Sequence, residues 1–361
     1  MADKEDDRPR THKWVRRDGA TIRQAPDRSQ MSVTTPEGEA PESTDLAQGM
    51  RAALIDWPIV ILRVVGHANG KLKLGQHPGR WVRGRLGGII DDVLDGGSSP
   101  RITNPNSPAH RLLGRHGRGS KPDGEAWAPF VVRADGMPEA LGDKGGDLRF
   151  ELVMAGEKAV SEVPAFIAAL RAGHPAPSGE PEIEWRTIQA MQVDEDGDPR
   201  WKSVPPGATE VPLVALDRIT EPRVRKGRMV FAFVSATPLA RRGDVGDVHG
   251  ECALVVDRLC RSMGAWMGRT SHRGPRIPVD DALRAAAEIT LVSDGTRAVE
   301  VPTRLIAAEG AQVDAEERVA ALTGVVTWKG DFSGLAPLLR AAHWVGMGPG
   351  RQHGLGQVSI R

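Results

Sequence analysis

Hydrophobic and polar positions alternate along this chain in two patterns, which predict strands and helices in turn. Short β-branched runs, such as PIVILRVV at 58–65, predict buried strands, whereas apolar residues spaced by three and four predict amphipathic helices. In the first half, the predicted elements are a strand at 58–65, a helix at 80–94, strands at 128–133 and 148–155, a helix at 161–172 and a strand at 182–192. Their order is β-α-β-β-α-β.

The same order returns in the second half, after a polar and proline-rich stretch at 194–226 that we interpret as a linker with an insertion. The elements predicted there are a strand at 227–235, a helix at 251–267, strands at 285–292 and 319–328, a helix at 333–344 and a closing strand at 357–360. Two consecutive split βαβ units predict an α+β fold of two tandem ferredoxin-like (RRM-like, βαββαβ) domains. RNA-recognition domains commonly bind RNA on the open sheet face of such a unit.

The domain organisation follows from this pattern. Residues 1–50 are polar and proline-bearing, which predicts a flexible N-terminal tail. We assign residues 51–205 to an N-terminal ferredoxin-like domain. Residues 206–361 then form a C-terminal ferredoxin-like domain that carries a glycine-rich loop near its end.

That loop, residues 346–356 (GMGPGRQHGLG), has five glycines in eleven residues and lies between the last predicted helix and strand. Glycines let backbone N–H groups approach a phosphate closely because no Cβ is in the way. Arg351 and His353 add a permanent cation and a titratable group. The alternative is a plain connection with several turn glycines. A Rossmann fingerprint is excluded because that motif follows a strand and opens a helix.

The basic residues are concentrated in three runs, although the formal net charge is only +1. Residues 80–121 hold eight Lys or Arg against three Asp, residues 218–242 hold seven against one Glu, and residues 258–276 hold five Arg and no acid. Each run is compatible with an ordinary solvated face. Three runs spread over both halves favour a groove that binds a polyanion.

Composition narrows the choice of chemistry. Cys252 and Cys260 are too few and too far apart for a disulfide framework or a zinc site, which fits a reducing cytosol. The charged N-terminus is unlike a signal peptide, and no apolar run reaches transmembrane length. We therefore expect a cytoplasmic protein with no membrane partner. Asp and Glu do not cluster as a two-metal nuclease requires, and the chain contains no tyrosine.

The C-terminal sequence resembles a known family. Its last helix runs into WVGMG at 344–348 and HGLGQV at 353–358, a glycine-rich segment followed by a short apolar strand. GVVTWKG at 324–330 and RGRLG at 83–87 are further family-like segments. Over about residues 54–361, the chain resembles the RAMP superfamily of CRISPR-associated proteins. Within that superfamily it is most similar to the endoribonucleases that process precursor CRISPR RNA.

This resemblance implies that CRISPR repeat RNA is bound and cut once, without metal or cofactor, to give crRNA. The ribose 2′-hydroxyl attacks the adjacent phosphate and leaves a 2′,3′-cyclic phosphate. The alternative is a non-catalytic RAMP subunit that holds guide RNA among the other subunits of a CRISPR effector complex. The missing tyrosine departs from the family pattern and favours this alternative. A basic ferredoxin-like protein with a different ligand is the third hypothesis.

The resemblance places a catalytic histidine near the first strand and first helix, so the candidates are, in order, His77, His67 and His116. His77 directly precedes the predicted helix, where Arg80 and Arg83 and the positive helix end would hold a phosphate. A nearby positive charge disfavours imidazolium, which suits a general base. The expected RNA-binding residues are Arg80, Arg83, Arg115, Arg118, Arg225, Lys226, Arg228, Gly346, Gly348, Arg351, His353, Gly354 and Gly356.

Overall fold

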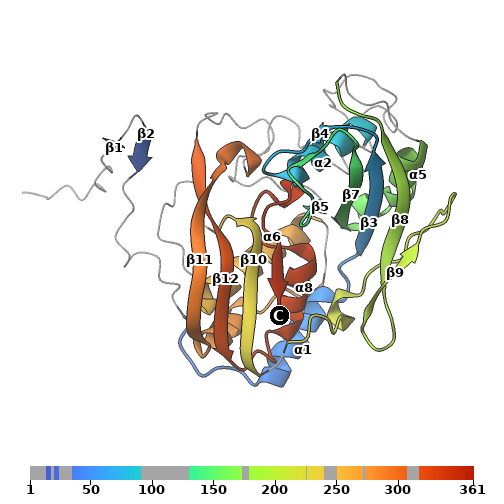
Figure 1. Cartoon of the computed structure of the whole chain (residues 1–361). Coiled ribbons are helices and arrows are strands. Elements are labelled where there is room, and N and C mark those ends of the chain that lie inside the picture. Colours follow the sequence, from blue (N-terminus) through green and yellow to red (C-terminus); the bar gives the residue numbers. More distant parts are fainter. Residues whose placement is uncertain are drawn as a thin grey trace, which may run out of the picture.

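The fold is α+β and contains two large antiparallel sheets (Figure 1). The computed structural model describes residues 14–17, 20–23, 35–90, 130–172, 179–224, 226–239, 250–270, 274–306 and 317–361. Two small sheets accompany the large ones, a hairpin of β1 (Trp14–Arg17) with β2 (Ala20–Arg23) and a pair of β4 (Leu72–Lys73) with β6 (Ala140–Leu141).

The first large sheet has the order β5-β7-β3-β8-β9. Its strands are β5 (Phe130–Arg133), β7 (Gly146–Ala155), β3 (Ile59–Ala68), β8 (Ile183–Val193) and β9 (Pro199–Ser203). The four strands predicted in the first half are confirmed. The first and third of them, β3 and β7, lie in the middle of the sheet because the chain crosses over through a helix after the first and third strands.

Two helices cover one face of this sheet, α2 (Pro78–Ile89) and α5 (Val163–Ala172). Side chains alternate across a strand, so Val60 and Leu62 of β3 share the face that these helices cover. They form one buried cluster with Val82 of α2 and Phe166 of α5. A short helix, α4 (Glu157–Val160), precedes α5. Both predicted helices of the first half are therefore present.

The second sheet has the order β11-β12-β10-β13. Its strands are β10 (Gly227–Thr237), β11 (Thr290–Pro302), β12 (Arg318–Gly330) and β13 (Val358–Ile360). Again the first and third strands, β10 and β12, are central. The helices of this half are α6 (Cys252–Arg269), α7 (Val279–Ala287) and α8 (Ala336–Val345). Single turns of 3-10 helix are η3 (Leu216–Arg218), η4 (Thr303–Leu305) and η5 (Arg351–His353).

The two halves share one hydrophobic core. Ile59 and Ile61 of β3 point away from α2 and join Trp266 of α6 and Leu339 of α8 in the largest buried cluster. Figure 1 shows α6 and α8 between the two sheets. The helices of the second half thus pack against the uncovered face of the first sheet, and this packing fixes the end of the chain relative to the first half.

Three segments differ from the sequence prediction. Ordered structure begins before residue 51, because α1 (Ser43–Leu54) buries Leu46, Met50 and Leu54 on one helical face against the shared core. The predicted 1–50 tail therefore contains most of a core helix. Its apolar residues were overlooked because polar residues surround them.

The stretch interpreted as a linker, 194–226, adds a fifth strand to the first sheet. Asp194 accepts backbone N–H bonds from Asp196 and Asp198, and Gly197 takes a φ of +86°, so a tight turn joins β8 to β9. The sequence did not predict β9 because the strand is mostly polar and most of its residues face solvent.

The strand expected at 285–292 was placed too early. Residues up to Ala287 belong to α7, whose buried positions Ala282, Leu283 and Ala286 have helical spacing. The strand β11 starts at Thr290 and is exposed along most of its length, so it lacks the alternation that marks a half-buried strand.

Candidate functional site

The glycine-rich segment at 346–356, called the C-terminal loop below, folds back on itself. Its five glycines all have φ between +69° and +81°, a left-handed conformation that other residues rarely adopt. Gly346 donates its N–H to the carbonyl of Ala342, Gly348 to Ser262 Oγ, and Gly356 to the carbonyl of Ala236. These three glycines are buried. We expected the N–H groups of these glycines to contact phosphate. They donate instead to other groups of the protein, so this expectation is corrected.

Arg351 is also directed inward. Its side chain is only 4% exposed, and its guanidinium lies 4.5 Å from the centre of the Trp266 ring. This stacking attaches the loop to α6. The structure therefore places Arg351 in the core rather than on a surface that RNA reaches.

The tip of the loop, η5, lies against the start of α2. A Cβ added to Gly79 would come within 2.6 Å of both the Cα of Gly354 and the carbonyl oxygen of His353. Only a residue without a side chain permits this approach. The C-terminal loop and the first helix of the opposite half consequently meet backbone to backbone, with His353 at the junction.

His77 lies at the same junction, as the residue directly before α2. It is half-buried, and its backbone carbonyl accepts the N–H of Arg80 at 2.9 Å. Burial lowers the pKa of His77 below its usual 6.5, and the charge of Arg80 lowers it further, while Glu139 opposes the shift. His77 is therefore neutral at physiological pH.

His353 is more deeply buried than His77. Burial lowers the pKa of its imidazole to about 3, with further contributions from Arg83, Arg80 and His77. Those three causes show that the four side chains are electrostatic neighbours. Two neutral imidazoles and two permanent cations thus gather where α2 meets the C-terminal loop. This combination can hold a phosphate and accept a proton beside it.

The two arginines differ in exposure. Arg80 is exposed in the first turn of α2, whereas Arg83 is partly buried and its guanidinium lies 5.9 Å from the centre of the Phe130 ring. The α2 N-terminus adds positive potential, since its cap residue makes no side-chain hydrogen bond to the first turn. Arg80, Arg83 and the helix N-terminus thus place positive charge at this junction, which Glu139 partly offsets.

His67, the second histidine candidate, lies elsewhere. It lies on β3 with its Nδ1 2.8 Å from Asp147 Oδ1 of the neighbouring strand. Alternation along β3 places its side chain on the face opposite to Val60 and Leu62, which pack against α2. The structure therefore does not bring His67 and His77 together.

Of the remaining expected site residues, two lie far from the C-terminal loop and four lie outside the described residues. Lys226 and Arg228 are exposed at the start of β10, and Lys226 pairs with Asp331 at 3.5 Å. The C-terminal loop contacts the other end of β10 at Ala236. At roughly 3.3 Å per residue along the strand, Ala236 lies about 26 Å from Arg228. His116, Arg115, Arg118 and Arg225 lie outside the described residues.

Sequence reasoning missed Gln357 and Glu139. Gln357 is 3% exposed and donates from Nε2 to the carbonyls of Val132 on β5, at 3.2 Å, and Gly354, at 3.0 Å. Glu139 precedes β6, and its carbonyl accepts the N–H groups of Leu74 and Gly75 in the segment before α2. Neither role leaves a local sequence pattern, because both depend on segments distant in the chain.

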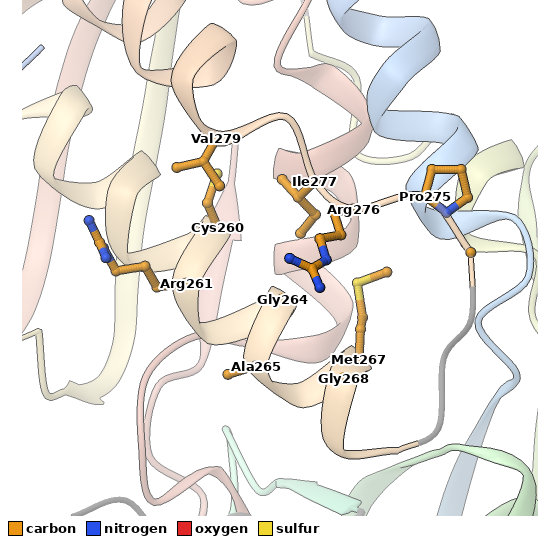
Figure 2. Close-up of a pocket in the computed structure, with 11 residues that line it drawn as sticks. Cys260, Arg261, Gly264, Ala265, Met267, Gly268, Pro275, Arg276, Ile277 and Val279 are labelled. Carbon is orange, nitrogen blue, oxygen red and sulfur yellow. The ribbon is translucent and has the colours of Figure 1, made fainter. Parts of the chain in front are cut away.

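A cavity lies on α6, away from the α2 junction. This cavity of about 660 Å³ is lined by one face of α6, including Arg261 and Gly264, and by residues 274–279, including Arg276 (Figure 2). Helical spacing puts this face opposite to Ser262, which contacts the C-terminal loop. Arg261 pairs with Asp257 at 2.7 Å. Among the described residues, the lining contains no histidine.

The part of the chain that the structure describes contains neither a metal-binding cluster nor a membrane-spanning helix. No group of three or more His, Cys, Asp or Glu side chains there is arranged to hold a metal ion. No helix in the same residues is long and apolar enough to cross a membrane.

This chain is similar to known proteins in its fold. Neither a protein-family model nor a curated protein matches the sequence. Among solved structures, a partial Cas6-RT-Cas1–Cas2 complex aligns with 84% of this chain and 46% of its own, with TM-score 0.51 and 13% identity.

Two further solved structures align with 84% of this chain and 99% of their own. Thermus thermophilus Cas6 has a TM-score of 0.48 and 15% identity. A RAMP protein binding different RNA substrates has a TM-score of 0.41 and 14% identity. The structural neighbours of this chain are therefore Cas6 proteins and a RAMP protein, the superfamily that its sequence resembles.

Proposed function

We propose that this protein is a metal-independent endoribonuclease that binds CRISPR repeat RNA and cleaves precursor crRNA. In this proposal its two halves, residues 51–205 and 206–361, are ferredoxin-like domains, and the glycine-rich loop joins the second to the first. The observation that carries the proposal is the position of neutral His77 beside Arg80, at the start of α2 and against the C-terminal loop. The fold is similar to that of the Cas6 complex described above.

His77 is suited to act as a general base. Its imidazole is neutral because burial and Arg80 lower its pKa, so it can accept the proton of a ribose 2′-hydroxyl. The 2′-oxygen then forms a bond to phosphorus while the P–O5′ bond breaks. The products are a 2′,3′-cyclic phosphate and a 5′-hydroxyl, whose oxygen takes a proton from water. His116, which lies outside the described residues, is the next candidate for this role, because His67 lies on the opposite face of the sheet.

Arg80 and Arg83 provide the phosphate contact in this mechanism. Both are permanently charged, and they flank the histidine from the same helix. Charge that develops on the phosphorane oxygens is stabilised by fixed cations in a partly desolvated site. Arg115, Arg118, Arg225, Lys226 and Arg228 would hold RNA outside the cleavage site, and the distance along β10 suits an extended substrate.

A non-catalytic RAMP subunit that binds guide RNA is the second candidate. The absence of tyrosine favours it, since the family pattern includes this residue. The Cas6 similar in fold belongs to a larger complex with other Cas proteins. Such a subunit would bind repeat RNA through the same basic surface and leave it uncut.

One experiment distinguishes the two candidates. Purified protein is incubated with repeat RNA in EDTA, and the product ends are analysed, with RNA carrying a 2′-deoxy substitution at the cut site as the control. Cleavage in EDTA, a 2′,3′-cyclic phosphate and no cleavage of the 2′-deoxy RNA are expected. A strict requirement for Mg²⁺ contradicts the mechanism, and tight binding without cleavage supports the non-catalytic subunit.

A further inference from the structure

Besides its backbone contact with Gly79, the C-terminal loop brings the side chain of His353 to the α2 junction. His353 is the last residue of η5, between Gly350 and Gly354, which have φ of +79° and +81°. Its backbone N–H is donated to the carbonyl of Gly350 at 2.8 Å, so the turn itself is closed. The imidazole is therefore the group whose position these two glycines determine.

This imidazole has an unusual environment. Its Nδ1 is buried and has no hydrogen-bond partner among the described residues. A polar atom in such a position ordinarily has a partner, so an unsatisfied one calls for an explanation, such as an ordered water, an ion or a role in catalysis. The charges of Arg83 and Arg80, the two residues proposed to hold the RNA phosphate, act on this ring, and Gly79 of the same helix packs against the His353 backbone.

Among the described residues, the ionisable groups that act on His353 all lower its pKa and so favour the neutral ring. Arg80 and Arg83 face it from α2, and His77 faces it from the segment before α2. β5 also packs on η5, but its Arg133 pairs with Glu151 at 3.5 Å. Burial is the largest cause of the low pKa, about 3, so a bound phosphate that offsets the arginines leaves the main cause in place.

A histidine in this state is a hydrogen-bond donor that does not give up its proton. A neutral imidazole carries one N–H, and a second proton would be needed for general acid catalysis. Neutral donors in water-excluded sites stabilise developing negative charge effectively, and a histidine held neutral by its surroundings is a known form of such a donor.

We infer that His353 donates a hydrogen bond, as a neutral imidazole, to a phosphoryl oxygen of the RNA at the cleavage site. This inference rests on the proposed function and extends it. The cleavage site is then composite, with the base and the cations on the first half of the chain and one neutral donor on the last turn of the second half. His353 acts on charge at phosphorus and takes no part in proton transfer.

The test compares three variants in single-turnover cleavage. His353→Ala removes the donor and should slow cleavage about 10²-fold, the typical effect of losing one oxyanion donor. His353→Gln and His353→Asn keep an N–H donor that cannot transfer a proton, and the better placed of the two should recover at least about tenfold of that loss. Affinity for uncleavable 2′-deoxy RNA and the melting temperature verify that each variant is folded and binds.

A modified substrate separates the two chemical roles. When sulfur replaces the 5′-bridging oxygen at the cut site, the leaving group needs no proton, so the loss caused by removing a general acid disappears. The loss in His353→Ala should persist with this substrate. Recovery to the wild-type rate, or amide variants as slow as His353→Ala, would overturn the inference.

The proposed function and this inference fail differently. If wild-type protein does not cut repeat RNA, the proposed endoribonuclease fails, and the inference fails with it. If wild-type protein cuts and His353→Ala cuts within about threefold of it, only the inference fails.

Discussion

Gln357 donates a hydrogen bond from Nε2 to the backbone carbonyl of Val132, 3.2 Å away, and so connects the end of the chain to β5 of the first sheet. The same amide group donates to the carbonyl of Gly354 at 3.0 Å. One buried side chain thus determines where the C-terminal loop lies relative to the first half. A catalytic site at the α2 junction depends on this connection.

Replacing Gln357 by Leu should therefore impair both folding and cleavage. The buried carbonyl of Val132 and the partly buried carbonyl of Gly354 would lose a donor, which costs about 1–3 kcal/mol for each group left unsatisfied. We expect a lower midpoint in denaturant unfolding and a cleavage rate reduced at least tenfold, about 1.4 kcal/mol in the barrier. Gln192→Leu, a partly exposed glutamine of β8, is the matched control. Equal effects of the two changes would show that Gln357 has no special role.

Gly79 gives a sharper test of the junction. In Gly79→Ala, the new methyl group would lie within 2.6 Å of the backbone at His353 and Gly354, so the loop must move away. Gly84→Ala is the control in the same helix, because nothing lies within 4 Å of its added Cβ. Ala also stabilises an exposed helix position by up to about 1 kcal/mol relative to Gly.

The expected result is slow cleavage by Gly79→Ala, at least about tenfold below wild type, whereas Gly84→Ala cleaves normally and melts at an equal or higher temperature. Single-turnover rates and thermal melting measure both. Normal cleavage by Gly79→Ala would mean that the contact between α2 and the loop is irrelevant to the reaction.

The sequence was sufficient for the element order, because the buried strands are apolar runs and the helices have regular apolar faces. The strand at 58–65 and the helix at 333–344 are examples of such strong patterns. By contrast, β9 and β11 were missed or misplaced because most of their residues face solvent. A strand that is exposed on both faces leaves no alternation to detect.

The candidate site was predictable only in part. His77, Arg80 and Arg83 are near each other in the sequence, so the helix start that they share was visible. The approach of His353 to them depends on contacts between residues more than 250 positions apart, which local pattern does not contain. The glycines were interpreted as phosphate ligands because glycine is compatible with both a close phosphate and a tight turn. The structure shows the tight turn.

The pH dependence of cleavage should report His77. A general base must be deprotonated, so the rate should fall as pH drops through a folded-state pKa that lies below the usual 6.5. Glu139 raises this pKa, and Glu139→Gln should therefore move the acid limb of the profile to lower pH. Asp143→Asn, an exposed carboxylate nearby in sequence, is the control. A limb that stays in place or moves to higher pH contradicts the assignment of the base.

The central claim is that His77 takes part in RNA cleavage at the α2 junction. The most direct measurement is single-turnover cleavage of repeat RNA in EDTA by wild type, His77→Ala and the control His67→Ala, whose histidine lies on the opposite face of the sheet. We predict that His77→Ala slows cleavage at least about a hundredfold while RNA affinity stays within about threefold, and that His67→Ala changes the rate little. A His77→Ala rate within a few-fold of wild type would contradict the account.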